Sequence, residues 1–239
     1  MAVIFQKKQG NDLIEVRSAG NSVRLYSNGV LHSQYNPNHK INGAIWDLLV
    51  LPGFFLAKPP RHVLVLGLGG GTVIHLIRHF FPQCNITCIE REALHIEIAK
   101  RYFKIPNDIT VIKGDAYVEL SKLNSKFDWV LDDVFQHVSG EPEREVAFDD
   151  VFSLYENVLS KNGVLSMNTI GKQQLNHLRV YKPKFESAYI MRHPLYDNGI
   201  VSLNRSQISK TMFFDALMKY KELDKRRKTC RLKVGLRQL

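Results

Sequence analysis

Cysteine and tryptophan are scarce in this chain of 239 residues, which has three cysteines and two tryptophans. Cys84, Cys88 and Cys230 lack the spacing of metal ligands, so we expect no metal site and interpret them as small buried hydrophobic residues. Neither a G-x-S-x-G motif nor a P-loop pattern occurs, which leaves the corresponding hydrolase and nucleotide-phosphate chemistries without support.

Long apolar runs are also missing. Residues 44–57 form the longest one, and it is interrupted by Asp47, Pro52 and Gly53 and is too short to cross a bilayer. The opening sequence MAVIFQKKQG has no signal-peptide pattern, because charge follows after six residues. We therefore expect a cytoplasmic protein without membrane association, with room for one α/β domain and a small appendage.

Positive charge is present in excess but unevenly placed. The formal net charge is +10, and residues 205–239 hold 11 Lys or Arg against three acids, a net of +8. This basic tail predicts either contact with nucleic acid or a solvated, partly disordered segment, and the sequence leaves both open.

The chain changes its pattern near residue 59. Residues 1–58 show short alternating runs at 13–17, 22–26 and 30–35, which predict an antiparallel hairpin module followed by a helix over 41–50. Residues 59–205 then alternate between strand and helix, and 206–239 are expected to hold a helix and the basic tail.

The alternating region predicts the fold class. We expect strands near 62–66, 85–90, 109–112, 127–132, 163–168 and 199–204, with helices near 71–81, 92–103, 116–123, 147–160, 173–187 and 209–225. This order is typical of an α/β protein with a Rossmann-like, doubly wound, mostly parallel sheet, preceded here by the small antiparallel module.

A glycine-rich turn follows the first of these strands. Gly67, Gly69, Gly70 and Gly71 separate the apolar run 63–66 from a helical pattern, and glycine lets the backbone pass close to a ligand. About 20 residues further on, Glu90 ends the next strand, where such folds place an acid against ribose hydroxyls. These features predict a nucleoside-cofactor site.

Acids follow the next two strands as well. Asp115 and Ala116 are placed to contact adenine, whose exocyclic amine is a donor, and Asp132 is placed beside the reactive centre, followed by Asp133. The loop spacing is G-x-G-x-G, with Thr72 at the final glycine of the dinucleotide pattern. A series of acids without a pyrophosphate site suits an uncharged nucleoside that carries a sulfonium.

The arrangement resembles the spermidine synthase-like family within the class I S-adenosylmethionine-dependent methyltransferase superfamily. The segments LYSNGVLHSQ, VLVLGLGGG, KGDAYVEL, FDWVLDD and VFSLYENVLSKNGVLSMN follow the order and spacing of that family. The resemblance implies a transferase that uses S-adenosylmethionine or its decarboxylated form, and a homodimer formed through the hairpin module.

Several positions depart from that family. Gly70 stands where members carry an acid that meets the ammonium of decarboxylated S-adenosylmethionine, and Phe135 stands where a second Asp deprotonates the attacking amine. Ile41 and Asn42 replace a Tyr-His pair, and His32 replaces a Gln. Asp133 lies two residues earlier than the missing acid and is expected to point elsewhere.

These departures favour methyl transfer. A plain glycine loop is expected to offer backbone N–H groups to the carboxylate of intact S-adenosylmethionine, and methyl transfer needs alignment more than a strong base. Asp132, Asp133 and His137 are the candidate catalytic or acceptor contacts. Residues 132–150 carry a net charge of −6, which suits either a cationic small-molecule acceptor or a solvated loop that caps a helix.

Two alternatives remain open. One is an aminopropyltransferase, a polyamine synthase that uses decarboxylated S-adenosylmethionine. The other is a non-catalytic nucleoside-binding scaffold that docks on nucleic acid through its basic tail.

Overall fold

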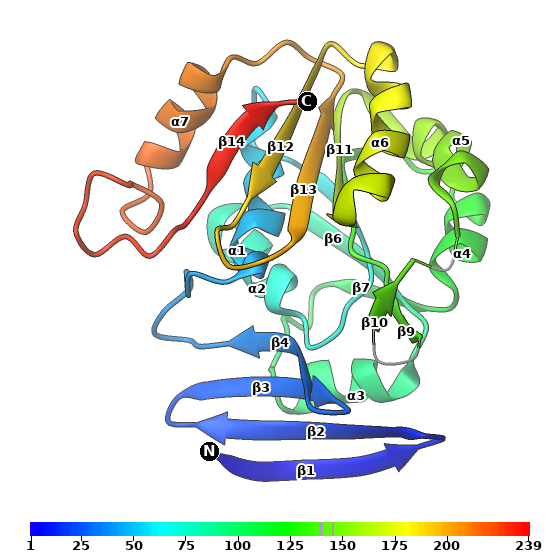
Figure 1. The fold of residues 1–239 in the computed structure, drawn as a ribbon, viewed down its shortest axis with the longest axis vertical. Coiled ribbons are helices and arrows are strands. Elements are labelled where there is room, and N and C mark those ends of the chain that lie inside the picture. Colours follow the sequence, from blue (N-terminus) through cyan, green and yellow to red (C-terminus); the bar gives the residue numbers. More distant parts are fainter. Residues whose placement is uncertain (139–140, 145) are drawn as a thin grey trace.

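An eight-stranded sheet forms the centre of the molecule in the computed structural model, which describes residues 1–138, 141–144 and 146–239 (Figure 1). Within this described part the strand order is β14-β12-β13-β11-β8-β5-β6-β7. The strands are β5 (His62–Leu66), β6 (Asn85–Glu90), β7 (Thr110–Lys113), β8 (Phe127–Asp132), β11 (Leu159–Ile170), β12 (Ser187–Arg192), β13 (Asn198–Asn204) and β14 (Gly235–Gln238). From β7 to β11 all neighbours are parallel, whereas β13, β12 and β14 are antiparallel to theirs. The predicted Rossmann-like, mostly parallel sheet is confirmed.

Helices cover both faces of this sheet because its central strands are apolar on both sides (Figure 1). One face packs against α1 (Ile45–Val50), the 3₁₀ helix η1 (Leu51–Phe55), α2 (Thr72–Phe80) and α7 (Lys210–Met218). The other packs against α4 (Ala116–Lys122), α5 (Phe148–Val158) and α6 (Gly171–Tyr181), with the 3₁₀ helix η2 (Lys182–Lys184) following. The two apolar clusters sit on opposite faces of the same strands.

A second, antiparallel sheet precedes the central one. Its strands β1 (Ala2–Gln9), β2 (Asp12–Ala19), β3 (Ser22–Ser27) and β4 (Val30–Tyr35) pair in chain order. Val16 and Leu25 of this sheet pack against Ile98 of α3 (Ala93–Arg101) and against Phe103. The predicted small antiparallel module is confirmed, and it rests on α3 (Figure 1).

The structure also contains strands that the sequence patterns did not predict. β1 precedes the predicted hairpins, and β9 (Gln136–Val138) pairs with β10 (Glu141–Glu143). The helix expected over 173–187 ends at Tyr181, and β12 follows it. β14 lies within the segment expected to be a tail and pairs with β12, so that part of the chain is ordered on the sheet edge.

The length and composition of each helix decide whether it could cross a membrane. Among the described residues, every helix is too short or too polar to cross a bilayer. The division at residues 58 and 205 stays a prediction, although β14 brings part of the last segment into the central sheet.

Candidate functional site

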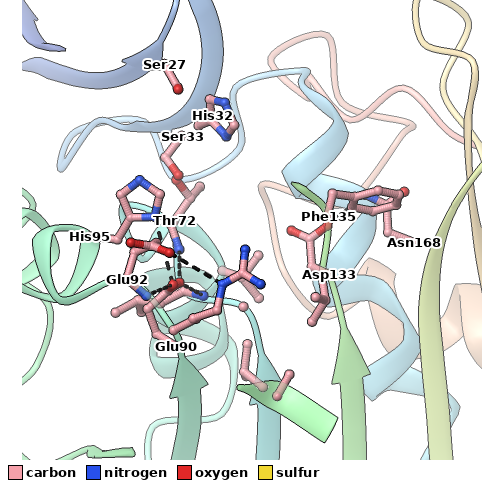
Figure 2. A pocket seen from close by; sticks show the side chains of 18 of the residues that line it. Ser27, His32, Ser33, Thr72, Glu90, Glu92, His95, Asp133, Phe135 and Asn168 are labelled. Carbon is pink, nitrogen blue, oxygen red and sulfur yellow. Dashed lines mark hydrogen bonds and ion pairs between the residues drawn. The ribbon is translucent and has the colours of Figure 1, made fainter. Parts of the chain in front are cut away.

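A cavity of about 690 Å³ lies at the carboxyl ends of β5, β6 and β8 (Figure 2). The end of the central sheet forms its floor, as expected for open parallel sheets. Residues from β3 and β4, including Ser27, His32 and Ser33, face it from the opposite side (Figure 2). The antiparallel sheet therefore completes a site whose floor belongs to the Rossmann-like sheet.

The glycine loop, residues 67–71, has the backbone geometry that its sequence predicted. Gly67, Gly69 and Gly71 adopt φ angles of 89°, 51° and 83°, in the left-handed region that favours glycine. A Cβ on Gly67 would lie 2.6 Å from the main-chain oxygen of Asp133. Of the predicted glycines, Gly67 and Gly69 line the cavity, whereas Gly70 and Gly71 are not among its lining residues.

Gly70 is enclosed from behind the loop. A Cβ at this position would lie 2.6 Å from the ring of Phe103 and 2.8 Å from Cβ of Ser33. Phe103 is itself buried, so its ring has little space to move aside. The position that carries an acid in spermidine synthases therefore has no space for any side chain here.

The N–H groups of the glycine loop are all engaged within the protein. Leu68 N and Gly69 N donate to Oε2 of Glu90 over 2.9 and 3.2 Å, and Gly70 N donates to Oγ of Ser33 over 2.8 Å. Gly67 N donates to the carbonyl of Ile89, and Gly71 N to that of Leu68. The expectation that these amides receive a cofactor carboxylate is therefore wrong for this structure, because a carboxylate already occupies two of them.

Glu90 ends β6 and lines the cavity while it is only 7% exposed. Its Oε1 accepts a 2.8 Å hydrogen bond from Glu92 N, in addition to the two bonds from the loop. Three backbone donors thus hold the carboxylate in one orientation, and Oε1, which accepts only one of them, keeps a lone pair for a further donor. A ribose hydroxyl is such a donor.

Asp115 and Ala116 follow β7 and also line the cavity. Oδ1 of Asp115 accepts hydrogen bonds from Tyr117 N and Val118 N, both 3.0 Å long, and so caps α4. Gly114 N donates to the carbonyl of Glu90, which places the ends of β6 and β7 side by side. The structure brings Glu90 and Asp115 to one cavity, as predicted, and gives Asp115 a capping role too.

Asp132 does not lie where the sequence predicted. Its side chain is fully buried and forms an ion pair with Arg144 at 3.0 Å. The hydroxyls of Tyr117 and Tyr155 donate to its Oδ2. Because it is engaged below the cavity and is not among the lining residues, the expectation that it lines the reactive centre is wrong.

Asp133 does face the cavity, together with Phe135 and Asn168 (Figure 2). Nδ2 of Asn168 donates to its Oδ1 over 2.7 Å, and Nδ2 of Asn198 donates to Oδ1 of Asn168 over 3.0 Å. Burial raises the pKa of Asp133 to about 6, although the Asn168 hydrogen bond opposes the shift. The expectation that Asp133 points away from the acceptor region is therefore wrong.

Other residues of interest divide between the cavity and the core. His32 lines the cavity, whereas Ile41 is buried in the core and Asn42 donates its N–H to Asp47. The side chain of His137 lies outside the described residues, as do those of the acids at positions 141, 143 and 145.

Several cavity residues were missed by the sequence interpretation. Asn168 and Asn198 line the acceptor side, together with Tyr196. Asn168 ends an apolar run in a predicted strand. Glu90 was identified as a polar residue at the end of such a run, and the same signal could have identified Asn168. Tyr196 and Asn198 carry no such local signal, because they reach the cavity through the β12–β13 connection.

Comparison with known proteins identifies the class of this fold. Residues 63–158 match a family described as "Methyltransferase domain". A polyamine aminopropyltransferase of Vibrio vulnificus is 28% identical over 165 residues, which cover 65% of this chain and 54% of that protein. The chain thus spans about half the length of this curated relative.

Solved structures agree with that class. A probable spermidine synthase from Corynebacterium glutamicum superposes with a TM-score of 0.76 at 16% identity, covering 100% of this chain and 91% of that one. Human methyltransferase-like protein 13, in a complex with SAH, superposes with a TM-score of 0.65 at 19% identity, covering 76% and 90%. The chain has the fold of class I S-adenosylmethionine-dependent methyltransferases. Within that class it has the spermidine synthase-like form.

Proposed function

We propose that this protein is an S-adenosylmethionine-dependent transferase, and that the group it transfers is methyl. One observation supports this most strongly. A single cavity joins the side-chain-free backbone of the glycine loop, the strand-end acids Glu90 and Asp115, and a separate acceptor region at Asp133.

The cavity residues fit the parts of the proposed cofactor. Gly67 and Gly69 have no side chain between the loop backbone and the methionine part. The remaining lone pair on Oε1 of Glu90 would accept from a ribose hydroxyl, and Oδ2 of Asp115 from the adenine amine, with Ala116 against the ring. S-adenosylmethionine, when bound, supplies an electrophilic methyl group on its sulfonium.

Asp133 is the residue that we assign to the acceptor. Its Oδ1 is held by Asn168, which leaves Oδ2 to accept the proton of an acceptor N–H. With a pKa near 6, the carboxylate is mostly deprotonated at neutral pH and still basic enough to take part in proton transfer. We expect a small-molecule acceptor with a nitrogen donor, and a cationic one would be attracted by the same carboxylate.

Two positions support methyl over aminopropyl transfer. The enclosed Gly70 offers no carboxylate to the ammonium of decarboxylated S-adenosylmethionine. Phe135 lines the cavity where the resembling family has its proton-accepting Asp. Because the loop amides already donate to groups of the protein, they favour neither S-adenosylmethionine nor its decarboxylated form. The choice between methyl and aminopropyl transfer therefore depends on Gly70 and Phe135.

Aminopropyl transfer is the second candidate. The Vibrio vulnificus relative is a polyamine aminopropyltransferase, which favours this candidate. Asp133 would then take the role of the missing proton acceptor, because its carboxylate is buried at the cavity.

Isothermal titration of the full chain separates the candidates. We expect S-adenosylmethionine to bind roughly tenfold or more tightly than its decarboxylated form, a difference of about 1.4 kcal/mol. Glu90→Ala should lose this binding, whereas Glu97→Ala, an exposed acid on the neighbouring helix α3, should keep it. Tighter binding of the decarboxylated compound, with turnover of putrescine, would establish the second candidate. Binding of neither compound would leave the non-catalytic scaffold.

A further inference from the structure

The basic segment that follows α7 is ordered on the edge of the central sheet. Leu232 and Val234 are 4% and 8% exposed and belong to the main apolar cluster. Arg231, which precedes Leu232, and Lys233, which lies between the two apolar residues, are exposed. This alternation is that of an extended chain with one face packed and one face in solvent. The positive charges are therefore held outward by burial of their neighbours.

Pairing with β12 extends this exposed face. Gly235 pairs with Arg192, and Arg237 pairs with Ile190, in an antiparallel register. Because side chains alternate along a strand, Lys233 and Arg237 share the face of Arg192. We call the four exposed cations Arg192, Arg231, Lys233 and Arg237 the basic strip.

The charge of the basic strip is not neutralised by the described residues. The nearby Asp224 is engaged by Arg226 and Arg227, and Glu222 by His79. Within the described ranges, the four cations of the strip form no ion pair with a carboxylate. Asp197, in the β12–β13 connection, is the exposed acid nearest in sequence to Arg192.

The strip lies close to the acceptor side of the cavity. Arg192 immediately precedes the connection that carries Tyr196, and Asn198 is the first residue of β13 after it. Both Tyr196 and Asn198 line the cavity. Burial lowers the pKa of His193 in this connection, and the positive charge of Lys233 lowers it further. Tyr196 is 36% exposed and lines the cavity, and its ring packs edge-on against that of His193, with the ring centroids 4.8 Å apart.

We propose that the basic strip binds the phosphate backbone of a single-stranded nucleic acid, with a base stacked on Tyr196. Fixed cations beside an exposed aromatic ring are the combination that single-strand binding uses, because phosphates pair with the cations and every base has a stacking face. Arginine, which makes up three of the four cations, also suits bidentate contact with phosphate.

The exposed ring of Tyr196 favours nucleic acid over an acidic protein surface, because a base can stack on it and a carboxylate cannot. The binding itself does not depend on the proposed transfer.

Fluorescence anisotropy with a labelled 20-nucleotide oligouridylate, without cofactor, tests the proposal on the full chain. Four phosphate contacts predict a slope of log affinity against log salt of about −2.8, or a roughly 50-fold loss between 50 and 200 mM salt. Arg231→Gln with Lys233→Gln should reduce the slope by about 1.4. Lys8→Gln with Lys161→Gln removes two exposed lysines elsewhere and should change it little.

Tyr196→Leu should weaken binding several-fold at every salt concentration, because it removes stacking and no charge. An equal loss of affinity in the Arg231/Lys233 double variant and in the Lys8/Lys161 control would overturn the proposal. Absence of binding at 50 mM salt would overturn it as well. Competition by polyglutamate as effective as by unlabelled oligouridylate would also overturn it and indicate an acidic protein partner. Cofactor titration on the same samples is a separate readout, so a failure here is distinguishable from a failure of the proposed transfer.

Discussion

Two adjacent acids at the end of β8 have opposite environments. Asp132 points into the core, where Arg144, Tyr117 and Tyr155 satisfy it, whereas Asp133 faces the cavity and accepts from Asn168. Adjacent residues of an extended chain point to opposite sides. Asp132 and Asp133 therefore cannot both face the cavity, and Asp133 is the one that does. Asp133 is therefore the acid of this pair that we propose for the acceptor chemistry.

Asp133→Asn should lower the transfer rate by 10²- to 10⁴-fold, the usual contribution of a positioned base. In the wild type, the rate should rise with pH through about 6 as the carboxyl loses its proton, and this rise should be missing in the variant. Steady-state kinetics from pH 5 to 8 measure both effects.

The same substitution should raise stability at pH 8. The pKa of Asp133 in the folded protein is above its ordinary value of 3.8, so its favourable contribution is present below pH 4 and is lost as pH rises through 6. A neutral Asn avoids that loss. Urea unfolding at pH 8 that shows a less stable variant would contradict the assigned burial.

Gly70→Ala should destabilise the protein by about 1–3 kcal/mol, because its Cβ would overlap the ring of Phe103 and Ser33. Gly235→Ala is the matched control, since the nearest atom to its Cβ is 3.9 Å away. Urea unfolding curves compare the two. Equal stability of both variants would show that Gly70 has space for a side chain.

At the scale of elements, Arg144 joins the segment after β10 to two central strands. It is 3% exposed, pairs with Asp132 at the end of β8, and donates to the main-chain oxygen of Asn168 in β11 over 3.1 Å. Its guanidinium also lies over the rings of Phe135 and Phe148. This one side chain therefore anchors the segment that borders the acceptor region.

Arg144→Met should cost about 3–5 kcal/mol, because it leaves the carboxylate of Asp132 buried without a counter-charge. Adding Asp132→Asn should recover part of that loss, since the amide has no charge to compensate. A double-mutant cycle by urea unfolding measures the coupling. Additive losses would show that the two residues do not form a pair in solution.

At the scale of the whole molecule, the antiparallel sheet and the Rossmann-like sheet share the glycine loop. Oγ1 of Thr72 accepts from Gln34 N over 3.1 Å and donates to the carbonyl of Gln34 over 3.0 Å, while Ser33 accepts from Gly70 N. The N-terminal sheet thus holds the loop from outside. The predicted homodimer through this module stays a prediction.

We expect the two sheets to unfold in one transition. Thr72→Val keeps the side-chain shape but removes both hydrogen bonds to Gln34, with an expected loss of about 1–3 kcal/mol. Native-state hydrogen exchange should then show the amides of β3 exchanging before those of β5, whereas the wild type protects both equally. Separate transitions in the wild type would contradict the coupling.

The local sequence was sufficient for most of the central sheet. Val63–Leu66 of β5 is apolar on both faces, the glycine loop needs positive φ angles, and Glu90 ends the next strand, so these features depend on near neighbours. The expected methyltransferase fold with a spermidine synthase-like form is confirmed by the comparisons. β14 was missed because its pairing with β12 joins residues about 45 positions apart.

Periodicity and glycine spacing determined by themselves the fold class, and the strand-end acids predicted where a cofactor would lie, because each of these signals depends on residues adjacent in the chain. Tertiary structure alone decided that Asp133 rather than Asp132 faces the cavity, that the loop amides are already engaged, and that the basic segment is ordered. Each of those outcomes depends on a partner distant in sequence, such as Asn168, Ser33 or β12, whose position is set only when the sheets pack.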